Sequence, residues 1–278
     1  MLFDTHCHLN FKAFDNIIKK VIDEAKKTGI KNIVIPGTDI DTSKKAVKIA
    51  NNFEGVYASV GIHPHHIKKY QLSNIDYKKD LAEIEKMLSE NKKIVAIGEI
   101  GIDKYIYQKT KYENYQIDEN FIKLQKIIFI NQLKLAKKYK KTVVIHNRQA
   151  TDEILKIFSD NQSLIDNLNL VFHCCEAQNK ILDFAIKNKI FIGIDGDIFY
   201  SKTKQDFVKK IPLELLVLET DAPFLSPFKK TKKDYFPNEP KNLKIIAEKI
   251  SEIKKISFEK LAETTTKNAE KLFKIKTN

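Results

Sequence analysis

The chain has 278 residues, of which 42% are hydrophobic, and it carries a formal net charge of +13. This is enough apolar material for a full core, and the absence of any run of about 18 apolar residues argues against a membrane span. Three cysteines are too few for a disulfide framework, and the first strand begins without a signal-peptide leader, so we expect a cytoplasmic protein.

The positive charge comes almost entirely from lysine, with Arg148 as the sole arginine. A charge of this size suits a polyanionic partner such as nucleic acid. It is more typical, however, of a generic solvated surface that is rich in lysine. The charge is therefore compatible with a nucleic-acid substrate but does not establish one.

Short apolar runs alternate with amphipathic helical patterns along the chain. Near-continuous apolar runs are typical of parallel strands covered on both faces, and spacings of three and four, as in Leu81, Ile84 and Leu88, indicate helices. This alternation predicts a single (β/α)8 TIM-type barrel over residues 1–278, with an open doubly wound sheet as the alternative. The expected strands are Leu2–Cys7, Asn32–Pro36, Val56–Ile62, Ile94–Ile100, Thr142–His146, Leu168–His173, Ile190–Ile194 and Leu215–Thr220.

Histidines and carboxylates lie at or just past the ends of these strands. His6 and His8 are two residues apart, so they share one face of a strand. In a barrel the carboxyl ends of all strands meet at one mouth, where active sites form. The other polar residues at strand ends, in chain order, are His63, His65, His66, Glu99, His146, His173, Glu219 and Asp221.

Imidazole together with carboxylate is a donor set for zinc, manganese or similar divalent ions. An isolated strand histidine is more often a core or surface residue, but an unpaired buried carboxylate such as Glu99, between glycines, is costly without a cation. Four histidines and two carboxylates exceed what one hydrolytic ion needs. We therefore predict two divalent ions (zinc, manganese or magnesium) with Glu99 as the bridging ligand.

Two long loops are expected on the same face of the barrel. The loop Asp103–Asp118 carries four tyrosines among lysines, and the loop Pro223–Pro240 carries the lysine-rich segment 229–233. Aromatic residues interleaved with cations suit base stacking and phosphate contacts. An ordinary polar loop explains them equally well.

Several segments resemble the TatD family of metal-dependent deoxyribonucleases, within the amidohydrolase superfamily. They span nearly the whole chain and are Asp4–Leu9, Gly61–His65, Gly98–Asp103, Val144–Arg148, Phe172–Cys174, Leu218–Pro223, Asn238–Pro240 and Asn268–Phe273. The resemblance implies a TIM-type barrel that hydrolyses phosphodiesters with a metal-activated water. It also implies that the metal ligands are His6, His8, Glu99, His146, His173 and Asp221.

The chain departs from the family pattern in three places, one of which is a longer loop after Asp103. Cys175–Ala177 stands where the family often has Phe-Ser-Gly, and Lys233–Pro237 stands where it usually has a basic Arg-Gly segment. These changes leave the implied ligands intact. They leave the substrate range open.

The expected roles follow from these positions. Asp221 would orient the attacking water and accept its proton, and Glu219 would position a ligand or share that proton. His63, His65 and Arg148 would bind substrate phosphate, whereas we expect His66 to be solvated.

The leading interpretation is a deoxyribonuclease that acts on DNA, attacking 3′ ends or single strands. The alternative is a metal-dependent esterase, such as a D-aminoacyl-tRNA deacylase or a small phosphoesterase. A non-catalytic nucleic-acid-binding barrel is a third interpretation, but it predicts decay of the ligand set, and every implied ligand is present. We expect no protein or membrane partner, and a monomer or weak oligomer.

Overall fold

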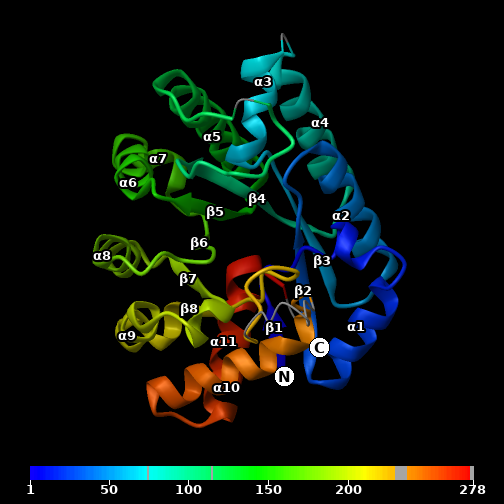
Figure 1. Cartoon of the computed structure of the whole chain (residues 1–278), viewed down its shortest axis with the longest axis vertical. Coiled ribbons are helices and arrows are strands. Elements are labelled where there is room, and N and C mark those ends of the chain that lie inside the picture. Colours follow the sequence, from blue (N-terminus) through cyan, green and yellow to red (C-terminus); the bar gives the residue numbers. More distant parts are fainter. Residues whose placement is uncertain (74, 114, 229–236, 276–278) are drawn as a thin grey trace.

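The computed structural model describes residues 1–73, 75–113, 115–228 and 237–275. One sheet of eight parallel strands follows the order of the sequence, and helices surround it (Figure 1). The prediction of a TIM-type barrel is therefore confirmed. The lysine-rich segment 229–233 lies outside the described residues.

All eight expected strands are present. They are β1 (Leu2–Asp4), β2 (Ile30–Pro36), β3 (Val56–Val60), β4 (Ile94–Asp103), β5 (Thr142–Arg148), β6 (Leu170–Phe172), β7 (Phe191–Ile194) and β8 (Leu216–Leu218). β1 ends at Asp4, before the expected end at Cys7, whereas β4 continues past the expected end at Ile100 as far as Asp103. It continues because Gly101 packs against β5, where a Cβ atom would lie 1.9 Å from the carbonyl oxygen of His146.

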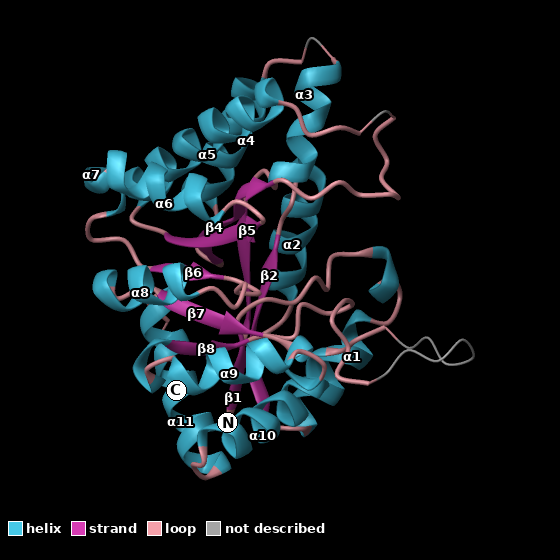
Figure 2. Cartoon of the chain, turned by 60° about the vertical axis from the view of Figure 1, so that its left-hand side comes forward, coloured by secondary structure: helices cyan, strands magenta, loops and turns pink. Residues whose placement is uncertain are grey.

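Helices cover the outside of the barrel, as Figure 2 shows from a second direction. They are α1 (Ile18–Lys27), α2 (Ile40–Asn52), α3 (Lys68–Leu72), α4 (Tyr77–Glu90), α5 (Glu119–Tyr139), α6 (Thr151–Asp160), α7 (Gln162–Ile165), α8 (Asn179–Asn188), α9 (Lys202–Lys210), α10 (Leu243–Lys254) and α11 (Phe258–Phe273). Within the described residues, no helix is both long enough and apolar enough to cross a membrane.

The ring closes where β1 meets β8. The backbone N–H of Thr5 donates to the carbonyl oxygen of Leu218 at 3.0 Å, and that of Asp221 donates to His6 at 2.9 Å. The backbone N–H of His8 then donates to Ala222 at 2.8 Å. We call this hydrogen-bonded junction the β1–β8 seam. Because these bonds lie at and just past the carboxyl ends of the two short strands, the seam fixes the backbone that carries His6, His8 and Asp221.

The barrel interior is filled by inward-facing apolar side chains. Val144, Val171 and Val217 are buried in this cluster together with residues of α11, including Leu272, which closes the amino-terminal end of the barrel. Successive residues of a strand alternate between faces, so positions two residues later point inward again, toward the opposite end. His146, His173 and Glu219 occupy these positions, which explains why they lie above the apolar core.

Candidate metal centre

The first group of donor atoms lies at the β1–β8 seam. The Nε2 atoms of His6 and His8 are 3.2 Å apart. Asp221 Oδ1 lies 3.6 Å from the first and 3.3 Å from the second, and Glu99 Oε2 lies 3.6 Å and 3.8 Å from them. Ligands held about 2.0–2.2 Å from a tetrahedral ion are about 3.3–3.6 Å from one another. The separations of His6 and His8 from each other and from each carboxylate oxygen, 3.2–3.8 Å, are therefore close to those between the ligands of one ion.

The second group surrounds the other oxygen of the Glu99 carboxylate. Oε1 lies 2.5 Å from His146 Nδ1, 2.8 Å from His173 Nε2 and 3.3 Å from His63 Nε2. The two oxygens of Glu99 are thus divided between two clusters of buried donors. This is the arrangement that a carboxylate bridging two cations requires.

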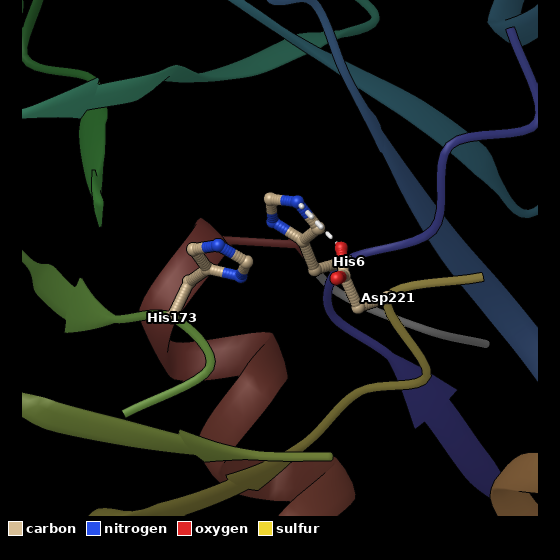
Figure 3. A group of neighbouring side chains, drawn as sticks. All are labelled: His6, His173 and Asp221. Atoms are coloured by element: carbon tan, nitrogen blue, oxygen red, sulfur yellow. Dashed lines mark ion pairs between the residues drawn. The ribbon is translucent and has the colours of Figure 1, made fainter. Parts of the chain in front are cut away.

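The two groups are in direct contact. The imidazole rings of His6 and His173 stack with their centroids 3.8 Å apart. Figure 3 shows both rings beside Asp221, although the three residues follow β1, β6 and β8 in the chain. Side chains from distant parts of the sequence therefore form one compact donor cluster.

The charges within this cluster favour cations. Burial raises the pKa of Glu99, but the positive charge of His173 and of two further imidazoles outweighs burial and holds this pKa well below its usual range. Burial likewise raises the pKa of Asp221, but a hydrogen bond with His8 and nearby positive charge lower it overall. Both carboxylates are therefore ionised at neutral pH and able to act as ligands.

A further carboxylate, Asp103, holds His146 in place. Its Oδ2 atom lies 3.0 Å from His146 Nε2 and accepts a hydrogen bond from the Tyr107 hydroxyl at 2.7 Å. Burial lowers the pKa of His146, but the charge of Glu99 and the bond to Asp103 raise it to about 9. With this pKa both ring nitrogens carry protons at neutral pH. The Nε2 proton faces Asp103, and the Nδ1 proton faces Glu99, where a bound cation would replace it.

The sequence analysis did not identify Asp103 as part of the site, because the expected strand ends at Ile100 and Asp103 was assigned to the loop that follows it. A signal was available, since Asp103 follows Glu99 by four residues and such positions share one face of an extended strand. Tyr107 was recognised only as one of several loop tyrosines.

Glu219 lies behind His173. Its Oε1 atom is 3.5 Å from His173 Nδ1 and accepts a hydrogen bond from the backbone N–H of Cys174, while Oε2 accepts one from the Thr5 hydroxyl at 3.2 Å. At 3.5 Å the charges attract, but the ring nitrogen and the carboxylate form no well-aligned hydrogen bond. The lining of the cavity above the cluster includes Asp221 but not Glu219.

The expected substrate-binding residues gather around one cavity of about 740 Å³, which His63, His65 and Arg148 all line. The Arg148 guanidinium lies 4.0 Å from the centroid of the Tyr105 ring and donates to the Tyr107 hydroxyl at 3.1 Å. The role of His63, His65 and Arg148 in binding phosphate stays a prediction.

His66 also lines this cavity, and its Nδ1 atom lies 3.0 Å from the Tyr112 hydroxyl. The expectation that His66 is solvated was therefore wrong. The reason is that the loop after β4 folds back over this histidine.

The chain is similar to proteins of one family. A sequence model described as "TatD related DNase" matches residues 3–274. The chain is 34% identical to the uncharacterized metal-dependent hydrolase YabD of Bacillus subtilis, over 99% of this chain and 100% of that protein. It is 30% identical to the human deoxyribonuclease TATDN3, over 98% of this chain and 94% of that protein. The crystal structure of YJJV, a TatD homologue from Escherichia coli K12, superposes with a TM-score of 0.85 at 25% identity, covering 99% of this chain and 98% of that one.

Proposed function

Because this chain belongs to the TatD family of metal-dependent hydrolases, we propose that its cavity is the active site of a deoxyribonuclease that removes nucleotides from the 3′ ends of single-stranded DNA. The observation that carries the proposal is the division of the two Glu99 oxygens between two donor clusters. Paired metal sites of this kind suit in-line attack on a phosphodiester. The name of the human relative, a deoxyribonuclease, supports DNA as the substrate.

The residues of the site fit two divalent ions. His6, His8 and Asp221 would hold one, His146 and His173 the other, and Glu99 both. The donor set of imidazoles and carboxylates suits zinc or manganese, with magnesium less favoured by ligand type. When bound, the ions would supply an activated water nucleophile and positive charge against the phosphoryl oxygens.

The chain's own groups would orient the reaction. Asp221 lines the cavity, is ionised, and lies beside His6 and His8, so it is placed to hold the attacking water and accept its proton. Of the two roles predicted for Glu219, the geometry favours orienting His173 over sharing that proton, because Glu219 lies behind the ring.

The other wall of the cavity supplies groups for the substrate. His63, His65 and Arg148 are placed to donate hydrogen bonds to phosphate oxygens. Arg148 is held by its stacking on Tyr105 and by its bond to Tyr107, so less side-chain entropy is lost when it binds an anion.

The test is a time course on 5′-labelled single-stranded and duplex DNA. Metal-stripped protein is reloaded separately with manganese, magnesium and zinc, and bound ions per chain are counted by mass spectrometry. Two ions per chain and a ladder that shortens from the 3′ end would support the proposal. Asp221→Asn should remove the ladder, whereas Asp152→Asn, at an exposed carboxylate on α6, should not.

Failure to cleave any DNA by protein shown to hold two ions would refute the deoxyribonuclease assignment. The esterase alternative would then be tested on aminoacyl-tRNA and on small phosphoesters, since the same donors activate water against carbonyl carbon.

A further inference from the structure

An exposed aromatic side chain stands at the mouth of the cavity. Among the described residues, eleven large hydrophobic side chains are exposed, and Phe224, at 47%, is the only one of them that lines the cavity. It follows Asp221 by three residues. An exposed apolar ring beside a polar donor cluster has no part in the core, so it is available to a ligand.

The backbone holds Phe224 firmly in this position. Its N–H donates to the carbonyl oxygen of Asp221 at 2.9 Å. The next residue, Leu225, packs its carbonyl oxygen against Gly196, where a Cβ atom would lie 1.9 Å away. Asn238 also ties down this loop by donating to Thr220 at 2.8 Å. The ring is therefore carried by an anchored turn.

Phe224 belongs to a group of three aromatic rings from opposite ends of the chain. Phe11 lies with its ring centroid 4.3 Å from that of His8, in a stacked arrangement, and 6.0 Å from that of Phe224, edge to face. The backbone N–H of Phe11 donates to His8 at 3.0 Å. All three side chains line the cavity. An apolar aromatic surface thus begins at a donor of the metal centre and runs outward to the mouth.

We propose that Phe11 and Phe224 form a stacking site for the base of the nucleotide whose phosphodiester is hydrolysed. Every nucleobase has an aromatic face that stacks on such rings, so the site would accept any base. The inference rests on the proposed function and specifies how that site takes its substrate.

The composition of the cavity walls supports a base on this side. Phe11 and Phe224 present carbon, whereas the polar wall presents Arg148 and His63. A nucleotide has the same division, with an apolar base face at one end and an anionic phosphate at the other. A base that is free of its partner strand exposes both of its faces, so we expect the site to favour single-stranded or frayed ends.

The experiment compares Phe224→Ala with Phe228→Ala as the matched control. Phe228 lies in the same loop and is 55% exposed, but it is not among the residues that line the cavity. Each variant, loaded with metal, is assayed on two single-stranded oligonucleotides that differ only in the 3′-terminal residue, which is either a normal nucleotide or an abasic analogue.

Stacking predicts that Phe224→Ala lowers kcat/KM about 5- to 150-fold on the oligonucleotide with a terminal base, which is the range that one stacked base provides. The same variant should lower kcat/KM less than about twofold on the abasic oligonucleotide. Phe224→Trp should restore cleavage of the first substrate, and Phe228→Ala should behave as wild type on both. An equal loss on both substrates, or no loss on either, would overturn the stacking site.

A second readout does not depend on turnover. An oligonucleotide with 2-aminopurine at its 3′ end and a phosphorothioate linkage beside it should lose fluorescence on binding the wild-type chain, because stacking on an aromatic ring quenches this base. Quenching should persist in Phe228→Ala and disappear in Phe224→Ala. If the wild-type chain cleaves neither oligonucleotide, the proposed function fails, and quenching alone then decides whether the stacking site exists.

Discussion

Replacing Asp103 by asparagine tests whether this buried carboxylate positions His146. One oxygen, Oδ2, accepts from both His146 Nε2 and the Tyr107 hydroxyl, while Oδ1 accepts from the backbone N–H of Tyr105 at 2.8 Å. Asparagine would put an amide N–H₂ group, which can only donate, at the position of either Oδ1 or Oδ2. There it would face a group that is itself a donor. At the Oδ2 position the amide nitrogen would face both His146 Nε2 and the Tyr107 hydroxyl, and at the Oδ1 position it would face the Tyr105 N–H, so at least one donor loses its acceptor in either orientation.

The expected loss of metal affinity follows from the hydrogen bond between Asp103 and His146. A hydrogen bond to a charged group contributes about 1.5–3 kcal/mol, which corresponds to about a 10- to 100-fold weaker hold on an ion that His146 helps to bind. Metal affinity is measured by competition with a chelator of known strength, and bound ions are counted after gel filtration. We expect Asp103→Asn to lose the ion at the Glu99 Oε1 cluster first.

Asp80→Asn is the matched control. Asp80 also accepts from a tyrosine hydroxyl, that of Tyr70 at 2.6 Å, and from Lys69, but it lies on α4 away from the cavity. Its substitution should change stability without changing metal affinity. If Asp103→Asn bound metal as tightly as the wild type, Asp103 would have no role in orienting His146.

Three further outcomes are expected. His63→Ala should raise KM with two ions still bound; because His63 Nε2 lies 3.3 Å from Glu99 Oε1, loss of an ion would instead identify His63 as a ligand. Removing the ions with a chelator should lower Tm by about 5–10 °C, which is the effect of losing about 2.7 kcal/mol of binding free energy. An unchanged Tm in calorimetry would mean that the native chain holds no ion tightly. Gly101→Ala should lower the free energy of unfolding by at least about 3 kcal/mol, because the φ of Gly101 is 153° and the new Cβ would lie 1.9 Å from the His146 carbonyl oxygen. A wild-type midpoint in urea unfolding would contradict this packing.

The barrel and the location of its polar residues could be predicted because both depend on local pattern. Apolar runs and helical spacings gave all eight strands, and the two-residue period of a strand placed His6 with His8. The meeting of strand ends at one mouth then brought His146 and His173 to the same place.

The partners of buried carboxylates could not be predicted, since they depend on distances that no local pattern encodes. Asp195 follows β7 and is buried, as Glu99 is, yet the cation beside it is the ammonium group of Lys204 on α9, at 2.6 Å. Nothing in the spacing of these residues distinguishes a carboxylate that faces a lysine from one that faces an ion. The aromatic surface of Phe11 and Phe224 was missed for the same reason, because its two rings are far apart in sequence.

The β1–β8 seam also has a consequence for biosynthesis. Asp221 is joined to the growing chain more than two hundred residues after His6 and His8. A nascent polypeptide therefore carries an incomplete set of donors until its last strand can close the ring. Fragments that end before that strand would therefore lack the proposed hydrolytic activity.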